Sequence, residues 1–468
     1  MKRIGILTAG GDTPALNATL HGAVVRACER RLEVYGLLKG FNSLFNPRLP
    51  HVHLNPLFQP IPELDPTIGG TLLGASRDYL DPADHRAASL MVERLHQLGI
   101  EGLVCVGGDG TLNGMQPLAE FLPVVLAPKT IDNDLGLNHR AEPREWERQP
   151  RDQPPGWKYV HHPNDSVFDL EYMVNFVTPG YATAVFVAAG GVERVRTTAE
   201  SHRRIAIIEV MGRHSGYIAL GTAYGQPDMI LIPEVPLDLD ALVVRVQDAY
   251  AYQKNAVIVC GEGIVDAQGR ELGDEQASVD PAGNRLLSGA AEALRRLLIK
   301  RIGDSYFRSL RRGESAREVI FTRKVGHTQR GGRPLLFDRF HAAQLGAKAV
   351  DLLREGANST MAVLQWNRQR GFHVDSFPAN GLRDPWGQIH ARRVHPAFYD
   401  GARMQPARLG VEYLQQIFTG AIGADDTEHQ RQTLFFPGKL LEPRRSINAA
   451  ISQRIQYLSR ANAETRAA

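Results

Sequence analysis

The chain has 468 residues, enough for two or three domains with a substantial core. Its 54 Lys and Arg residues nearly balance 51 Asp and Glu residues, for a formal net charge of +3, which argues against a nucleic-acid-binding or membrane protein. The three cysteines, Cys28, Cys105 and Cys260, lie far apart without metal-ligand spacing, so we expect a reduced, cytoplasmic protein. No apolar run approaches the ~18 residues that a membrane-spanning helix needs.

Short β-branched runs alternate with segments of helical spacing along most of the chain. We expect buried strands at residues 4–8, 32–38, 103–106, 124–127, 205–210, 229–232 and 256–260. We expect helices at residues 15–31, 86–98, 112–121, 215–224 and 239–253. This alternation is typical of α/β proteins with parallel sheets covered on both faces, where ligands bind beyond the carboxyl ends of the strands.

Three stretches interrupt the alternation. Residues 137–165 are rich in Pro, Arg, Glu and Trp and lack an apolar period, which predicts an inserted surface loop or lid. Residues 266–315 are first polar and then helical, with an amphipathic helix expected over residues 286–302. Beyond about residue 373 the pattern is irregular, and it ends in an expected basic amphipathic helix with the apolar residues Ile447, Ile451, Ile455 and Leu458.

Two glycine-rich turns follow early strands. Residues 8–17 contain Gly10 and Gly11, and paired glycines before a helix let main-chain amides approach an anion at the positive helix terminus. A tight strand-to-helix turn explains these glycines equally well. The second turn, residues 69–77, adds Arg77, which can hold a transferring phosphoryl group by forked, charge-assisted hydrogen bonds. A surface salt bridge is the simpler alternative for this arginine.

A third glycine-rich loop, from Gly107 to Thr111, surrounds Asp109. Because Mg²⁺ prefers hard oxygen ligands and substrate phosphates, Asp109 is placed to hold that cation directly or through water. Asp109 could instead cap the helix that begins nearby, but capping does not explain why Gly108 and Gly110 flank it on both sides.

The sharpest signal is the loop from Thr130 to Asp134, which has the sequence Thr-Ile-Asp-Asn-Asp. Phosphoryl transfer to an alcohol needs positioning, charge neutralisation and a carboxylate that accepts the hydroxyl proton. Asp132 can be that base, Asp134 a second metal or solvent ligand, and Thr130 an orienting hydroxyl. Two acidic residues in one turn are common for local hydrogen-bonding reasons. Four phosphate-compatible loops at strand ends, taken together, predict a kinase.

Further charged side chains lie at later strand ends. These are Arg204, Arg213, Glu262, His327 and Arg330. The two arginines and the histidine that follow strands suit a phosphate on the acceptor molecule, distinct from the donor phosphates. Glu262 can accept hydrogen bonds from sugar hydroxyls. A lone histidine is more often a structural hydrogen-bonding residue, so His327 carries little weight alone.

The set and order of these loops resembles the phosphofructokinase family over roughly residues 1–370. The matching segments are residues 10–12, 69–77, 107–111, 128–134, 204–213, 233–235 and 326–332. The resemblance implies Mg²⁺-dependent phosphoryl transfer to the 1-hydroxyl of fructose 6-phosphate, as in glycolysis. It also implies two doubly wound, mainly parallel-sheet α/β domains with the active site between them, followed by an irregular, partly helical C-terminal extension.

The resemblance assigns roles by position. The implied catalytic residues are Asp132 as general base, with Thr130, Asp134 and Arg213. The implied donor-binding residues are Gly10, Gly11, Arg77, Asp109, Gly110, Thr111 and Lys129, with Asp109 also holding the metal. The implied acceptor-binding residues are Thr130, Asp132, Arg204, Met211, Gly212, Arg213, Glu262, His327 and Arg330. Some of these come from a neighbouring subunit in the family, so a homodimer or homotetramer is implied.

The resemblance also implies a division of the chain into domains. Residues 1–136 with part of 240–340 are expected to form the phosphoryl-donor and catalytic domain. Residues 166–265 with 316–372 are expected to form the sugar-phosphate domain. Residues 137–165 are then an insert, and residues 373–468 are the C-terminal extension.

Two positions bear on whether the donor is ATP or pyrophosphate. In the resembling family, the pyrophosphate users carry an aspartate at the place of Gly110. The side chain of that aspartate crowds and repels the α-phosphate of a nucleotide. Gly110 leaves that space open and favours ATP. Lys129 is usual in pyrophosphate users, but it also occurs in an ATP-using branch that pairs it with glycine. We give the direct steric argument more weight and expect ATP.

The chain departs from the family pattern at several positions. Ala15 replaces a usual glycine, and Phe321 replaces the usual arginine six residues before His327, with Arg323 or Arg317 as possible substitutes. His21 and Val25 occupy the places of effector-binding arginines in allosteric bacterial enzymes, so regulation of that type is in doubt. The insert directly follows the catalytic loop, so another acceptor sugar phosphate stays open.

Other functions fit the sequence less well. Lipid and NAD kinases share Gly-Gly-Asp-Gly-Thr but lack the loops at residues 130–134 and 326–332. A catalytically inactive sugar-phosphate or nucleotide sensor is disfavoured by intact Asp109, Asp132 and Arg213. A Rossmann dinucleotide-binding protein is disfavoured because no G-x-G-x-x-G opens a helix after a strand.

Overall fold

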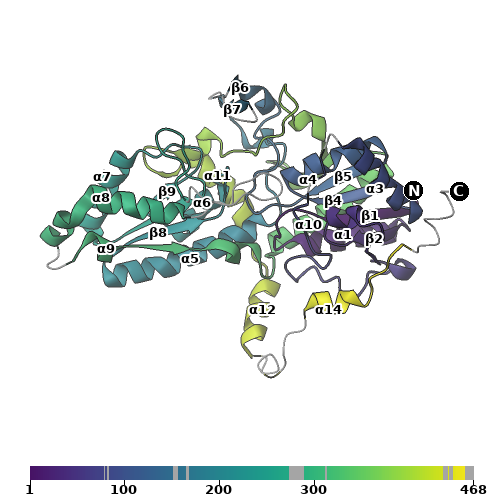
Figure 1. The fold of residues 1–468 in the computed structure, drawn as a ribbon. Coiled ribbons are helices and arrows are strands. Elements are labelled where there is room, and N and C mark those ends of the chain that lie inside the picture. The colour runs from purple at the N-terminus through teal and green to yellow at the C-terminus, as the bar shows by residue number, and fades with distance from the viewer. Residues whose placement is uncertain are drawn as a thin grey trace.

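The expected apolar runs form the strands of two separate α/β units, which lie side by side in the computed structural model (Figure 1). The structure describes residues 1–78, 80–81, 84–150, 156–164, 168–273, 289–310, 314–435, 441 and 446–458. Among these residues, no helix is both long and apolar enough to cross a membrane.

The first unit is built on a seven-stranded sheet in the order β13-β12-β5-β4-β1-β2-β3. Its strands are β1 (Arg3–Thr8), β2 (Glu33–Leu37), β3 (His51–His53), β4 (Leu103–Gly107), β5 (Val124–Pro128), β12 (Thr360–Asn367) and β13 (Gly371–Pro378). The edge strands β3 and β13 are antiparallel to their neighbours, and the other strands are parallel. Its helices are α1 (Leu16–Glu29), α2 (Phe41–Phe45), η1 (Pro56–Phe58), α3 (His85–Gln97), α4 (Asp109–Gly114), η2 (Gln116–Glu120) and α10 (Leu336–Arg354).

Successive residues of a strand point to opposite faces, so this sheet is covered on both sides. Ile4 and Ile6 of β1 join one buried cluster with residues of α1 and α10. Leu7 and the β4 residues Leu103 and Cys105 join a second cluster with residues of α3. The near-continuous apolar character of these strands is therefore explained by burial on two faces.

The second unit has a four-stranded parallel sheet in the order β11-β8-β10-β9. Its strands are β8 (Ile205–Val210), β9 (Met229–Leu231), β10 (Ala256–Gly261) and β11 (Ile320–Lys324). Its helices are α5 (Tyr181–His202), α6 (Tyr217–Gly221), η5 (Thr222–Gly225), α7 (Leu239–Gln253), α8 (Ala290–Leu310), α9 (Ala316–Val319) and η6 (Gly326–Arg330). Helices α5 and α6 cover one face, and α7 and α8 cover the other.

The α/β class with mainly parallel sheets confirms the predicted fold class. The expected domain boundaries, however, differ from the sheets in one place. Residues 316–372 were expected in the second unit, but only β11 pairs there, whereas β12 pairs with β5 of the first sheet. Of residues 240–340, only a part of which was expected in the first unit, α7 and α8 pack on the second sheet and the start of α10 belongs to the first unit. Local periodicity identifies a strand or helix but carries no information about which distant strand it joins.

Several predicted helices differ in length. The helix expected at residues 112–121 is divided at Met115 into α4 and η2, because Pro117, in the first turn of η2, cannot donate the hydrogen bond that would continue α4. The helix expected over residues 286–302 corresponds to α8, which begins at Ala290 and continues to Leu310. Residues 286–288 lie outside the described residues. The expected C-terminal helix ends as α14 (Ile447–Ser452), because Gln456 instead exchanges two main-chain hydrogen bonds with His51, of 3.0 and 2.8 Å.

The insert forms a short hairpin beside the C-terminal segment. It contains η3 (Glu142–Glu145) and the antiparallel strands β6 (Trp146–Pro150) and β7 (Trp157–His161), and η4 (Leu170–Tyr172) follows it. The Trp146 ring stacks on His390 with centroids 3.7 Å apart. The C-terminal region contains η7 (Ala379–Leu382), η8 (Pro396–Phe398), β14 (Tyr399–Asp400), β15 (Gln405–Pro406), α11 (Arg408–Phe418) and α12 (Ala424–Phe435) before α14.

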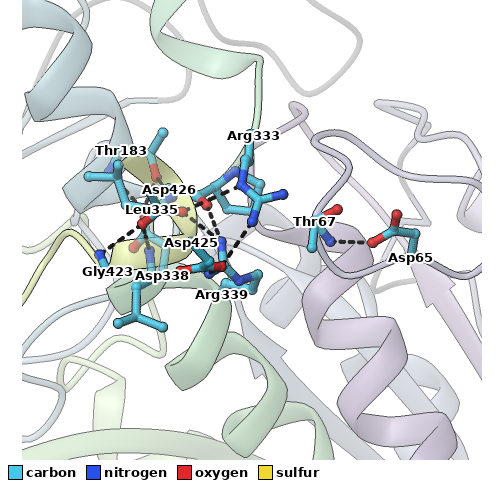
Figure 2. Close-up of polar contacts among 12 residues, drawn as sticks. Asp65, Thr67, Thr183, Arg333, Leu335, Asp338, Arg339, Gly423, Asp425 and Asp426 are labelled. Carbon is cyan, nitrogen blue, oxygen red and sulfur yellow. Dashed lines mark hydrogen bonds and ion pairs between the residues drawn. The ribbon is translucent and has the colours of Figure 1, made fainter. Parts of the chain in front are cut away.

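Helix α12 is attached to the start of α10 by ion pairs (Figure 2). Asp425 lies 2.9 Å from Arg333, and Asp426 lies 3.0 Å from Arg339. Asp426 also accepts a hydrogen bond of 2.9 Å from the main-chain amide of Leu336. These contacts fix the position of the C-terminal region relative to the loop that precedes α10.

Candidate active site

A cavity of about 580 Å³ lies where the carboxyl ends of strands from both units face each other. From the first unit it receives the loops after β1, β4 and β5, and from the second unit the loops after β8, β10 and β11. This is the position at which open parallel sheets bind ligands.

Most of the predicted site residues line this one cavity. They are Gly10, Gly11, Arg77, Asp109, Gly110, Thr111, Lys129, Thr130, Asp132, Asp134, Met211, Arg213, Glu262, His327 and Arg330. Gly212 lies between two of the lining residues without lining the cavity itself. Arg204 is exposed at the amino end of β8, the end away from the cavity.

The turn that carries Asp132 is held in a specific conformation. The main-chain amide of Asp132 donates a hydrogen bond of 3.1 Å to the Thr130 hydroxyl. Asn133, between the two aspartates, has a left-handed φ of 57°, and both flanking aspartates line the cavity. Oδ1 of Asp132 is shielded from solvent and has no hydrogen-bond partner among the described residues. A shielded carboxylate oxygen without a partner, beside a cavity, is suited to accept a proton from a bound hydroxyl.

Three carboxyl groups of the cavity have raised pKa values. Desolvation raises the pKa of Asp132, and the positive charges of Arg330 and Arg213 oppose that shift. Desolvation and the charge of Asp132 raise the pKa of Asp134 to about 7. Desolvation, followed by the charge of Asp132, also raises the pKa of Glu262 to about 7. Groups with such displaced pKa values in a cavity are typical of catalytic sites.

The loop after β4 leaves open space at Gly110. A Cβ atom added to Gly110 would meet no atom within 4 Å. The main-chain amide of Gly110 donates a hydrogen bond of 2.7 Å to Oδ1 of the neighbouring Asp109. The cavity therefore has open space directly beside Asp109.

Lys129 lies beneath the first glycine loop. It is buried, and its ammonium group donates a hydrogen bond to the main-chain carbonyl of Gly11. Desolvation, with the nearby charge of Arg330, lowers the pKa of Lys129 to about 7. Its side-chain nitrogen therefore lies next to the loop where phosphates are expected, and the charge of a bound phosphate would favour its protonated form.

Acidic residues in this cavity suit a magnesium ion held jointly with phosphates. Asp109 lines the cavity, and its charge contributes to the raised pKa of Asp132 and Asp134. Among the described residues, no group of three His, Cys, Asp or Glu side chains is arranged to hold a metal ion alone. Mg²⁺ normally binds through one or two carboxylates and completes its coordination with water and substrate phosphates, so the residues present fit that ion.

Comparison with known proteins identifies the family. A sequence model described as phosphofructokinase matches residues 3–140 and 169–353. The chain belongs to the phosphofructokinase family. It is 34% identical over 371 residues to ATP-dependent 6-phosphofructokinase 2 of Streptomyces coelicolor, an alignment that covers 78% of this chain and 91% of that protein.

Relatives whose names specify pyrophosphate as the phosphoryl donor are about as similar to this chain. The pyrophosphate–fructose 6-phosphate 1-phosphotransferase of Dictyoglomus thermophilum is 31% identical over 404 residues, covering 86% of this chain and 97% of that protein. The crystal structure of a pyrophosphate-dependent phosphofructokinase from Marinobacter aquaeolei has the same fold, with a TM-score of 0.66 at 16% identity, covering 90% of this chain and 92% of that one. Membership of the phosphofructokinase family therefore leaves the donor open.

Lys324 is a cavity residue that sequence reasoning missed. It ends β11, lines the cavity and lies 3.0 Å from the buried carboxylate of Glu209. The proposed substitutes for the family arginine at Phe321, namely Arg323 and Arg317, are not among the lining residues. The signal for Lys324 was its place three residues before His327, at a strand end.

Other lining residues were not predicted individually, although several of them lie in the predicted glycine-rich loops. They are Ala9, Thr13, Phe41, Asp78, Gly108, His214, Gly326 and Ala391. Ala391 belongs to the irregular segment after residue 373, and nothing in its sequence marks it as part of a phosphofructokinase site. None of the described residues of the insert at 137–165 lines the cavity, so the expected lid contributes no lining residue here.

Proposed function

We propose that this protein transfers the γ-phosphoryl group of ATP to the 1-hydroxyl of fructose 6-phosphate, giving fructose 1,6-bisphosphate in glycolysis. The observation that carries the proposal is the unpartnered Asp132 oxygen in a cavity that also contains an unobstructed Gly110. The ATP-dependent names of relatives such as the Streptomyces coelicolor enzyme support it. As a glycolytic kinase the protein would act in the cytoplasm.

In this proposal the Thr130–Asp134 turn performs the proton transfer. Asp132 accepts the proton of the 1-hydroxyl as that oxygen forms its bond to the γ-phosphorus and the bond to the ADP oxygen breaks. Thr130 orients the turn through its hydrogen bond to the Asp132 amide. Arg213, whose Nε is shielded and lacks a described partner, stabilises charge on the transferring group.

The donor occupies the first unit and the acceptor the second. Gly10, Gly11, Arg77, Gly110, Thr111 and Lys129 hold the donor phosphates. Asp109 holds Mg²⁺, which when bound neutralises charge on those phosphates. Met211, Gly212, Arg213, Glu262, His327 and Arg330 hold the sugar phosphate.

A homodimer or homotetramer is part of the proposal. Arg204 and Met211 are separated by the six residues of β8, on the order of 20 Å at about 3.3 Å per residue. Arg204 is therefore too far from the cavity of its own chain to bind the same phosphate. A neighbouring subunit that receives Arg204 would explain its predicted role.

Pyrophosphate is the second candidate donor. It is favoured by the buried Lys129 ammonium at the glycine loop, where it can bind a small, highly charged donor. The name of the Dictyoglomus thermophilum relative, whose alignment covers 86% of this chain, also favours it.

A donor comparison tests the proposal. Purified protein is incubated with Mg²⁺ and fructose 6-phosphate, with ATP in one reaction and pyrophosphate in the other, and fructose 1,6-bisphosphate is measured. Turnover with ATP alone is the expected result. Turnover with pyrophosphate alone would overturn the donor assignment, and absence of turnover with both would overturn fructose 6-phosphate as acceptor.

A further inference from the structure

The C-terminal region contributes a buried arginine directly behind the catalytic turn. Arg392 is only 1% exposed and lies beyond residue 353, where the match to the family ends. Its neighbour Ala391 lines the cavity. Arg392 does not line the cavity, so any effect on the reaction must act through other residues.

Arg392 binds the main chain of the turn from two directions. Its guanidinium donates hydrogen bonds of 3.2 Å (Nε) and 2.7 Å (Nη2) to the carbonyl oxygen of Asn133. Its own main-chain amide donates a hydrogen bond of 2.6 Å to the carbonyl oxygen of Asp134. Arg392 therefore holds two consecutive peptide groups that follow Asp132.

The rest of the guanidinium is fastened to a second buried segment. It donates to the carbonyl oxygens of Asn175 and Phe176, and it lies over the Tyr217 ring at 5.0 Å. A planar group with five donors can bridge several carbonyls in this way, whereas an ammonium group cannot reproduce the fork. The turn is thereby tied to the segment before α5.

Tyr413 holds the side chain of the same asparagine. Its hydroxyl accepts a hydrogen bond of 2.6 Å from Nδ2 of Asn133 and donates one of 2.9 Å to the carbonyl of Phe176. Oδ1 of Asn133 accepts a hydrogen bond of 3.0 Å from the amide of Thr178. Asn133 is thus held by its side chain and its carbonyl in a left-handed conformation that non-glycine residues rarely adopt.

We propose that Arg392, assisted by Tyr413, is a positioning residue that holds the Asn133 peptide and so aims the Asp132 carboxylate at the acceptor hydroxyl. The C-terminal extension is then part of the catalytic apparatus through these two side chains. The expected effect of Arg392 on turnover rests on the proposed function. Its expected effect on the conformational order of the Thr130–Asp134 turn does not.

The test compares Arg392→Ala and Arg392→Lys with Arg295→Ala. Arg295, in α8, also donates to main-chain carbonyls, those of Ile320 and Arg317, but it lies outside the cavity lining and contacts no residue of the C-terminal region in these hydrogen bonds. Because small misplacements of a reacting group cost about a hundredfold in rate, we expect kcat of Arg392→Ala to fall by roughly that factor with the KM values little changed. Millimolar guanidinium, compared with equal NaCl, should partly restore kcat in Arg392→Ala only. Arg392→Lys should stay impaired.

Hydrogen exchange gives a readout that needs no substrate. Peptides covering residues 130–136 should exchange faster in Arg392→Ala and in Tyr413→Phe than in the unmodified protein, whereas peptides from α7 should not change. If Arg392→Ala does not fold, the exchange rate of residues 130–136 in Tyr413→Phe decides whether the proposal holds. Unchanged exchange in this turn, or wild-type kcat in folded Arg392→Ala, would overturn the proposal. An unmodified protein inactive on fructose 6-phosphate would instead overturn the proposed function, with exchange still deciding the role of Arg392.

Discussion

The guanidinium of Arg330 lies against the first glycine loop, with Nη1 3.3 Å from the carbonyl oxygen of Asp12. These two residues belong to different units, and Arg330 lines the cavity. A Cβ atom on Gly11 would lie only 2.6 Å from the same Nη1, so the glycine permits the approach. Arg330 therefore lies between the loop proposed to bind the donor and the unit proposed to bind the acceptor.

The charge of Arg330 should set the acid limit of activity. Burial raises the pKa of Asp132, and Arg330 is the leading charge that opposes this rise. Arg330→Gln removes the opposing charge, so the pKa of Asp132 should rise further and the acid limb of kcat/KM should move to higher pH. Arg330→Lys, which keeps the charge, should shift it less. The measurement is a pH profile of kcat/KM for both variants and the unmodified protein. An acid limb at the same pH in all three proteins would contradict the electrostatic account.

Removal of the proposed base should act on turnover rather than on binding. Asp132→Asn keeps the size of the side chain but cannot accept the hydroxyl proton, so kcat should fall by several orders of magnitude with little change in KM for the sugar phosphate. Steady-state kinetics of the purified variant measure both constants. Near-normal turnover would show that another group is the base.

A buried glutamate in the insert should make stability depend on pH. Desolvation raises the pKa of Glu142 to about 7 from an ordinary value of 4.5. The folded protein then binds the proton more tightly than the unfolded chain, so the stabilisation is fully present below pH 4.5 and is lost as pH rises through about 7. The loss is on the order of 3 kcal/mol.

Glu142→Gln has no such proton to lose. Its free energy of unfolding should therefore fall less between pH 5 and 8 than that of the unmodified protein. Denaturant unfolding at several pH values measures this difference. Parallel pH dependence in the two proteins would exclude Glu142 as the source.

The sequence predicted the parts of the site that depend on local patterns. Asp109, Lys129 and Glu262 each lie within three residues of the end of a predicted apolar run, and parallel sheets bring such ends together. Helix α7 was likewise predicted with the bounds that the structure gives it, because its apolar residues recur at helical spacing.

The parts that depend on long-range pairing were not predictable in this way. The pairing of Met361 with Leu126 places β12 in the first sheet, and no local pattern encodes that register. Arg392 lies in an irregular segment, and its importance follows only from the distant carbonyls that it contacts. Phe321 left open which cation replaces the family arginine, and the lining of the cavity points to Lys324.

The donor should be decided by the space at Gly110. A Cβ atom at this position meets nothing within 4 Å, so Gly110→Ala should keep its use of ATP and serves as the matched control. Gly110→Asp adds a carboxylate to the space proposed for the nucleotide, so both bulk and charge repulsion should lower kcat/KM for ATP far more than any use of pyrophosphate. Kinetics with each donor at saturating fructose 6-phosphate provide the comparison. An equal loss with both donors in Gly110→Asp, or a large loss with ATP in Gly110→Ala, would mean that this position disturbs the loop itself and does not select the donor.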